Sequence, residues 1–122
     1  MTQLSKALID ALDKAKALPY TRHRSRHFAK LLDKRGRVVV EAPNSYNKTH
    51  PEFQRVAESI GLGVKCYQHA EFSVINRDRL KRGYRLVVGR VDVDGNPVNS
   101  MPCPVCMEFI KLHGNIKIIE WS

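Results

Sequence analysis

Two short stretches, His69-Ala70-Glu71 and Pro102-Cys103-Pro104-Val105-Cys106, decide how this chain is organised. Each lies where hydrophobic spacing predicts that a helix begins, the first helix over residues 68–80 and the second over residues 103–113. Between them, Tyr84 to Val93 alternates polar and apolar residues as a strand does. The two stretches therefore open neighbouring helices of one α/β unit.

The remaining predicted elements complete a single domain over residues 1–122, in which residues 1–21 form an N-terminal helix and a basic lead-in. We expect helices over 4–18 and 51–60, an antiparallel hairpin over 25–33 and 36–42, and a final strand over 116–121. The last two strands run parallel through a helical crossover. The predicted fold is a three-layer α/β domain, with helices flanking a mixed central sheet.

Composition is that of an ordinary globular protein, with 43% hydrophobic and 27% charged residues among 122. No apolar run reaches the length of a membrane span. The N-terminal segment carries lysines and has no apolar core, so it is not a secretory signal. These features predict an intracellular, cytoplasmic protein with no membrane partner.

The chain is strongly basic, with a formal net charge of +9. Such an excess favours polyanionic partners, either nucleic acid or nucleotide phosphates. Two clusters carry much of the charge, one around the hairpin and one after the helix that opens at His69. Their members are Arg22, Arg24, Arg26, Lys34, Arg35 and Arg37 in the first, and Arg77, Arg79, Lys81, Arg82 and Arg85 in the second.

Cys103 and Cys106 at a helix start place both sulfurs on one side of the first turn, where the helix dipole stabilises thiolates. His69 adds a third ligand for Zn²⁺, and three protein ligands leave the fourth tetrahedral position to water. Zinc would lower the pKa of that water to about 7. Glu71 is close to the metal without being needed as a ligand, so it is the predicted catalytic proton carrier.

Two other interpretations of these residues stay open. A closed structural zinc site would need a fourth ligand, which His27, His50, His113 or Cys66 could supply. A redox-active Cys-x-x-C pair is also conceivable, but it leaves His69-Ala70-Glu71 unexplained.

Taken together, the two stretches resemble the H-x-E…P-C-x-x-C signature of zinc deaminases. Over residues 22 to 121 the chain looks like a member of the cytidine and deoxycytidylate deaminase superfamily. The loop from Asn44 to Pro51 is similar to that of short, phage-type members. The resemblance implies one zinc per subunit, held by His69, Cys103 and Cys106, and hydrolytic conversion of cytosine to uracil.

The resemblance also implies three substrate contacts. Asn44 matches the asparagine that binds a sugar hydroxyl, and the backbone of Ala70 and the carbonyl of Met101 match groups that hold the base. An alternative for Asn44 is a plain turn residue after Pro43.

The sequence departs from the family pattern at positions that bear on the choice of substrate. Phe72 to Ile75 lacks an asparagine often seen in deoxycytidylate deaminases, and Met107-Glu108 replaces a common alanine. After its fourth predicted strand the sequence shows no further helix and strand of the kind that members usually add. An uncovered sheet edge predicts a homo-oligomer.

Three functions are therefore compared. The first is deamination of a free cytosine nucleoside or nucleotide such as deoxycytidylate. The second is deamination of cytosine in single-stranded DNA or RNA, for which the two basic clusters would form a groove beside the pocket. The third is a non-catalytic nucleic-acid-binding protein on a deaminase scaffold, against which the intact His69, Glu71, Cys103 and Cys106 argue. Adenine deamination shares the same zinc chemistry.

Overall fold

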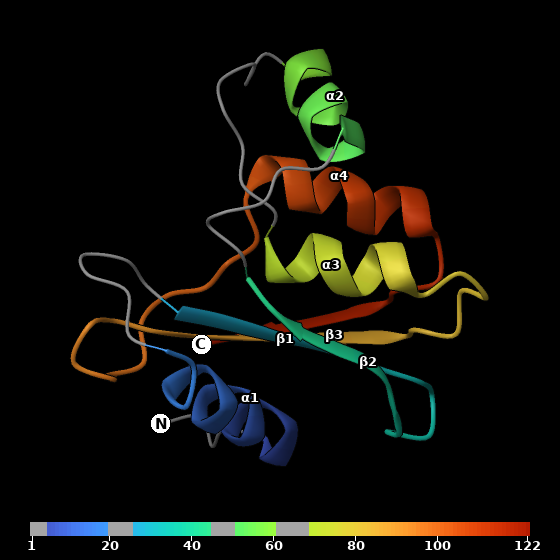
Figure 1. Cartoon of the computed structure of the whole chain (residues 1–122). Helices are drawn as coiled ribbons and strands as arrows, with labels where there is room; N and C mark the ends of the chain where they lie inside the picture. The colour runs from blue at the N-terminus through green and yellow to red at the C-terminus, as the bar shows by residue number, and fades with distance from the viewer. Residues whose placement is uncertain (1–4, 20–25, 45–50, 61–68) are drawn as a thin grey trace.

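The sheet has four strands in the order β2-β1-β3-β4 (Figure 1). The computed structural model describes residues 5–19, 26–44, 51–60 and 69–122. Strands β1 (Arg26–Leu32), β2 (Val38–Pro43) and β3 (Arg85–Val91) pair antiparallel, with β1 between the other two. Strand β4 (Ile118–Trp121) pairs parallel to β3. The predicted mixed sheet and its parallel crossover are confirmed.

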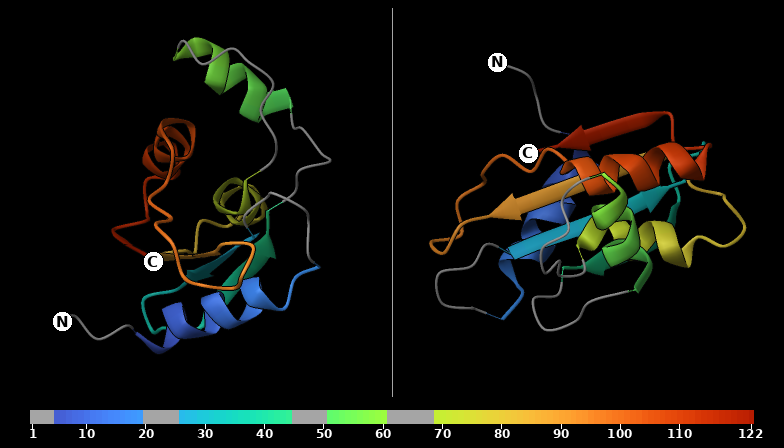
Figure 2. Two further views of the ribbon diagram at one scale, coloured as in Figure 1. Left: turned by 90° about the vertical axis from the view of Figure 1, so that its left-hand side faces the viewer. Right: turned by 90° about the horizontal axis from the view of Figure 1, so that it is seen from above.

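Helices cover both faces of the sheet, which gives three layers (Figures 1 and 2). Helix α1 (Lys6–Lys16) lies on one face, and α3 (Ala70–Arg77) and α4 (Pro104–His113) lie on the other. Helix α2 (Pro51–Ser59) lies beyond α4, away from the sheet. In the described residues no helix is both apolar enough and long enough to pass through a bilayer.

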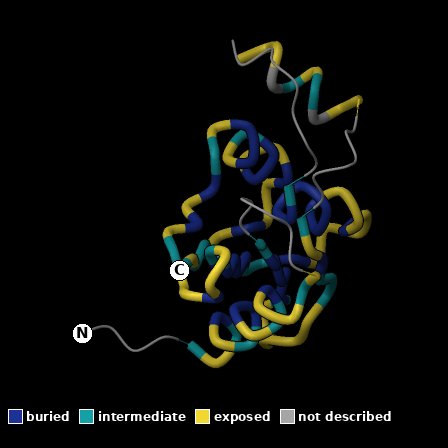
Figure 3. Tube along the Cα trace, turned by 60° about the vertical axis from the view of Figure 1, so that its left-hand side comes forward, coloured by how far each residue is buried: buried dark blue, intermediate teal, exposed yellow. Residues whose placement is uncertain are grey.

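Each face of the sheet has its own apolar core, because successive side chains of a strand point to opposite faces. On β1, Phe28 and Leu32 pack against α1, whereas Ala29 and Leu31 pack against α3 and α4. Figure 3 shows buried residues concentrated in the sheet and in the helix faces turned toward it.

Several predicted elements extend beyond the observed ones, among them the first helix, which ends at Lys16 rather than at residue 18, and the second strand, which begins at Val38 rather than at residue 36. Helix α3 ends at Arg77 rather than at residue 80, because the carboxylate of Asp78 accepts backbone N–H groups of Arg82 and Gly83 and forms a loop. Strand β3 spans Arg85–Val91 rather than 84–93, because the Asp92 carboxylate accepts the N–H groups of the turn at residues 94 and 96. Strand β4 begins at Ile118 rather than at residue 116.

Candidate metal centre and active site

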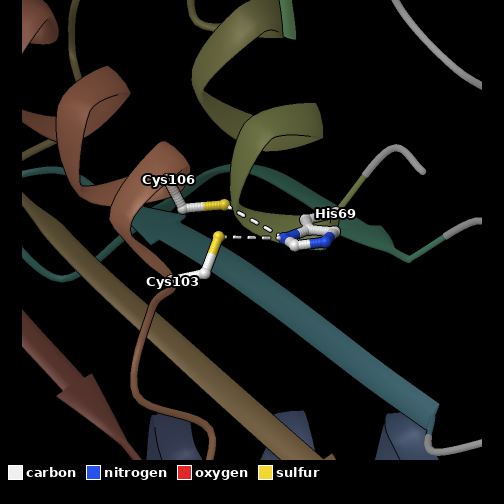
Figure 4. Close-up of side chains that lie close together, drawn as sticks. All are labelled: His69, Cys103 and Cys106. Carbon is white, nitrogen blue, oxygen red and sulfur yellow. Dashed lines mark hydrogen bonds between the residues drawn. The ribbon is translucent and has the colours of Figure 1, made fainter. Parts of the chain in front are cut away.

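The starts of α3 and α4 meet at one end of the sheet and bring His69, Cys103 and Cys106 together (Figure 4). Both cysteine Sγ atoms lie 3.4 Å from Nδ1 of His69. The three candidate ligand atoms all lie within 4.8 Å of one another. One imidazole nitrogen and two sulfurs converging in this way form a donor set that suits Zn²⁺.

Backbone geometry explains why these side chains converge. His69 and Cys103 are the N-cap residues of α3 and α4, both in extended conformation, and neither side chain makes a capping hydrogen bond to its own helix. Pro104 follows Cys103 at the start of α4, where proline suits the first helical turn. The two N-cap side chains are therefore directed at each other across the gap between the helices.

Electrostatics within the cluster favour one thiolate. A hydrogen bond from Cys106 lowers the pKa of the Cys103 thiol to about 4, and His69 adds to the effect. The same hydrogen bond, together with burial, raises the pKa of Cys106 well above its usual value. Burial would lower the pKa of His69, but the bond to Cys103 and its charge raise it. The lowered pKa of Cys103 favours its thiolate, the form in which cysteine binds a metal.

Glu71 is buried beside this cluster, with only 4% of its surface exposed. Burial raises the pKa of its carboxyl group, while a hydrogen bond with Cys106 and the charge of His69 act in the other direction. Within the described residues the metal-binding group contains neither Glu71 nor His27. His113, one of the residues that could supply a fourth ligand to a closed structural site, instead pairs with Asp78, its Nε2 lying 2.7 Å from the carboxylate.

The predicted substrate contacts lie at the same end of the sheet. Asn44 follows β2, and its side-chain Oδ1 accepts the backbone N–H of His27 at 3.0 Å. Ala70 is buried at the start of α3, and Met101 is 61% exposed in the loop before Cys103. His50 and Cys66, and residues 45–50 of the loop that begins at Asn44, lie outside the described residues.

The sequence suggests for His27 only the role of a fourth metal ligand. The structure instead places it on β1 between Asn44 and Arg90 of β3. Its Nδ1 atom is buried and has no hydrogen-bond partner in the described part of the chain. The alternation His27, Ala29, Leu31 was the one signal in the sequence that places its side chain on the face of α3 and α4.

The two basic clusters are only partly adjacent to the metal centre. Lys34, Arg35, Arg37, Lys81 and Arg82 line two adjoining hollows of about 610 and 290 Å³. These hollows lie at the hairpin and at the loop before β3, which is the end of the sheet opposite to His69. Arg85 pairs with Glu120, and Arg26 binds backbone carbonyls after α1. Arg22 and Arg24 lie outside the described residues.

Comparison with solved structures identifies similar folds. The cytidine deaminase of Mycobacterium tuberculosis is 26% identical, with a TM-score of 0.53 over 93% of this chain and 81% of that one. The cytidine deaminase of Mycobacterium leprae is 24% identical, with a TM-score of 0.54 over 93% of this chain and 85% of that one, a likeness of fold. Neither the protein-family models nor the curated proteins give a match.

Proposed function

We propose, since the chain is a member of the cytidine deaminase-like superfamily, that it is a zinc-dependent deaminase acting on cytosine in a free nucleoside or nucleotide such as deoxycytidylate. The observation that carries the proposal is the convergence of His69 Nδ1 with the sulfurs of Cys103 and Cys106, with a buried carboxyl group beside them. A cluster of three ligands fits a catalytic zinc site, which keeps one position open.

When bound, zinc supplies a Lewis acid that activates water near neutral pH. The side chains of the protein carry the protons. The Glu71 carboxylate takes a proton from the attacking water and returns it to ring N3, and the second proton goes to the exocyclic amine. Cytosine and water thereby give uracil and ammonia. Asn44, the backbone of Ala70 and the carbonyl of Met101 are the proposed substrate contacts.

Cytosine in single-stranded nucleic acid is the second candidate substrate. A continuous groove of basic residues would support it, but Lys34, Arg35 and Arg82 lie at the end of the sheet opposite to the metal cluster. Their position supports the free substrate, because a strand held by them would lie at the end of the sheet away from His69, Cys103 and Cys106.

One experiment compares these functions directly. Zinc-loaded protein is incubated in parallel with cytidine, deoxycytidine, deoxycytidylate and a cytosine-containing oligonucleotide, and uracil is measured in each. Product from the free substrates supports the proposal, whereas uracil only in the oligonucleotide rejects the free substrate. No product anywhere, with one zinc bound per chain, supports the non-catalytic binding protein.

A further inference from the structure

His27 is held in a defined position beside Asn44 and Arg90. Its backbone N–H donates to Oδ1 of Asn44 at 3.0 Å, and its carbonyl accepts the backbone N–H of Asn44 at 3.2 Å. On the other side of β1, His27 stands opposite Arg90 of β3. The ring is therefore carried by a strand that neighbours fix on both sides.

The side chains of His27 and Arg90 lie on the face of the sheet that bears the metal cluster. Ala29 and Leu31, next but one along β1, pack in the core with Ala70 and Cys106, and Val88 on β3 belongs to the same core. Because side chains on one strand alternate and paired residues share a face, His27 and Arg90 point toward the starts of α3 and α4.

The imidazole of His27 has an unused hydrogen-bonding atom. Nδ1 is buried, and no partner for it exists among the described residues. Burial, then the charges of Arg90 and His69, lower the pKa of His27 to about 4. The lowered pKa favours the neutral form of the ring. A buried polar atom without a partner destabilises a fold, so its retention at this position points to a ligand.

We propose that His27 and Arg90 form a subsite for the phosphate group of a cytosine nucleotide. Nδ1–H of His27 donates to a phosphate oxygen, and Arg90 supplies the positive charge. Arg90 is anchored for this role, since its Nη1 donates to the carbonyl of Asn99 at 3.0 Å in the loop that leads to Met101. The inference rests on the proposed deaminase function and makes the substrate a nucleotide rather than a nucleoside.

The test measures binding rather than turnover, with zinc-loaded Glu71→Gln protein and calorimetric titration of deoxycytidylate and deoxycytidine. We expect the nucleotide to bind roughly 10- to 100-fold more tightly, the ratio expected of charge-assisted hydrogen bonds. His27→Phe and Arg90→Gln should each weaken the binding of deoxycytidylate alone, so that the affinities for the nucleotide and the nucleoside become similar. His27→Asn, which places an amide near the position of Nδ1, should restore part of the preference.

Arg82→Gln is the matched control, because it removes one exposed positive charge at the opposite end of the sheet. It should leave both affinities unchanged. Inorganic phosphate should compete with deoxycytidylate and not with deoxycytidine. Thermal melting of each variant confirms that it is folded.

Two results would overturn the subsite. The first is that protein with His27 and Arg90 intact binds deoxycytidylate and deoxycytidine with equal affinity. The second is that Arg90→Gln and His27→Phe weaken the binding of both ligands equally. If Glu71→Gln protein binds neither ligand, the deaminase proposal itself fails. A nucleoside that binds without any preference for the nucleotide leaves the deaminase proposal standing and rejects the subsite alone.

Discussion

At the scale of single residues, two of the three candidate metal ligands occupy positions where a helix normally has a stabilising cap. Serine, threonine, aspartate or asparagine at an N-cap stabilises a helix by about 1 kcal/mol. His69 and Cys103 occupy the N-caps of α3 and α4 and make no such bond, whereas Ser5 caps α1 through its Oγ. The chain thus gives up local helix stability at the two places where ligands are needed.

Glu71→Gln should abolish most turnover while leaving the metal in place. An amide cannot carry the proton, so kcat should fall by about 10²- to 10⁴-fold. Zinc content, measured by mass spectrometry on the same preparation, should stay at one per chain. Near-normal deamination by this variant would exclude Glu71 as the proton carrier.

Cys103→Ser should lower zinc occupancy without unfolding the chain, because Cys103 is only half-buried. Chelation of the unsubstituted protein should lower its Tm, since a ligand at 100 times its Kd stabilises the native state by about 2.7 kcal/mol. Calorimetric melting with and without chelator measures the change in Tm, and mass spectrometry measures the zinc content of Cys103→Ser. A chelator-insensitive Tm together with unchanged zinc content in Cys103→Ser would contradict the proposed ligand set.

At the scale of elements, Asp78 ties the end of α3 to the end of α4. Its carboxylate accepts from His113 at 2.7 Å and from the N–H of Gly83 at 2.8 Å. Removing one partner of a buried pair leaves the other uncompensated, so Asp78→Ala should lower the free energy of unfolding by about 3 kcal/mol. Urea denaturation measures the change, and Asp13→Ala on the exposed side of α1 is the control.

The same pair makes stability depend on pH. Burial would raise the pKa of Asp78, but hydrogen bonds from His113 and the loop N–H groups lower it below its usual value. Ionised Asp78 therefore contributes to the free energy of unfolding above the unfolded pKa of about 3.9. This contribution is lost as pH falls through the lower pKa of the folded state. Denaturation midpoints between pH 5 and pH 2 should therefore fall less steeply in Asp78→Asn.

Helix α1 lies so close to β3 that only glycine fits at residue 89. A Cβ there would lie 2.9 Å from the backbone nitrogen of Leu12 and 3.0 Å from the carbonyl carbon of Ala11. Because backbone cannot yield as a side chain does, Gly89→Ala should destabilise the fold by about 1–3 kcal/mol. An unchanged denaturation midpoint would mean that α1 is not seated this closely on the sheet.

At the scale of the whole molecule, the basic residues Lys34, Arg35 and Arg82 lie at the end of the sheet opposite to His69. The triple variant Lys34→Gln, Arg35→Gln, Arg82→Gln should change kcat/KM for a free nucleotide by less than about two-fold in 0.15 M salt, where the Debye length is ~8 Å. Steady-state kinetics at that salt concentration provide the measurement. A large loss would place the pocket nearer to these side chains than the sheet topology does.

The edge strand β4 is short, and its first and last residues, Ile118 and Trp121, are 45% and 41% exposed. Association of copies through this edge remains a prediction, which light scattering of the purified protein tests.

Local patterns were sufficient to predict the helices, the hairpin and the three candidate metal ligands. Helix starts and strands are governed by neighbours within a few residues, and the histidine and the two cysteines stand at such starts. Element ends were less predictable, because Asp78 and Asp92 end α3 and β3 through side-chain hydrogen bonds to later backbone.

The order of motifs and elements therefore predicted the fold class and the candidate ligands His69, Cys103 and Cys106, because the helix starts at which they stand depend on short-range spacing. The subsite around His27 and Arg90 became visible only in the tertiary structure. Their pairing depends on the register between β1 and β3, which distant packing determines. The same packing places Lys34, Arg35 and Arg82 at the end of the sheet opposite to His69, a separation that spacing along the chain does not encode.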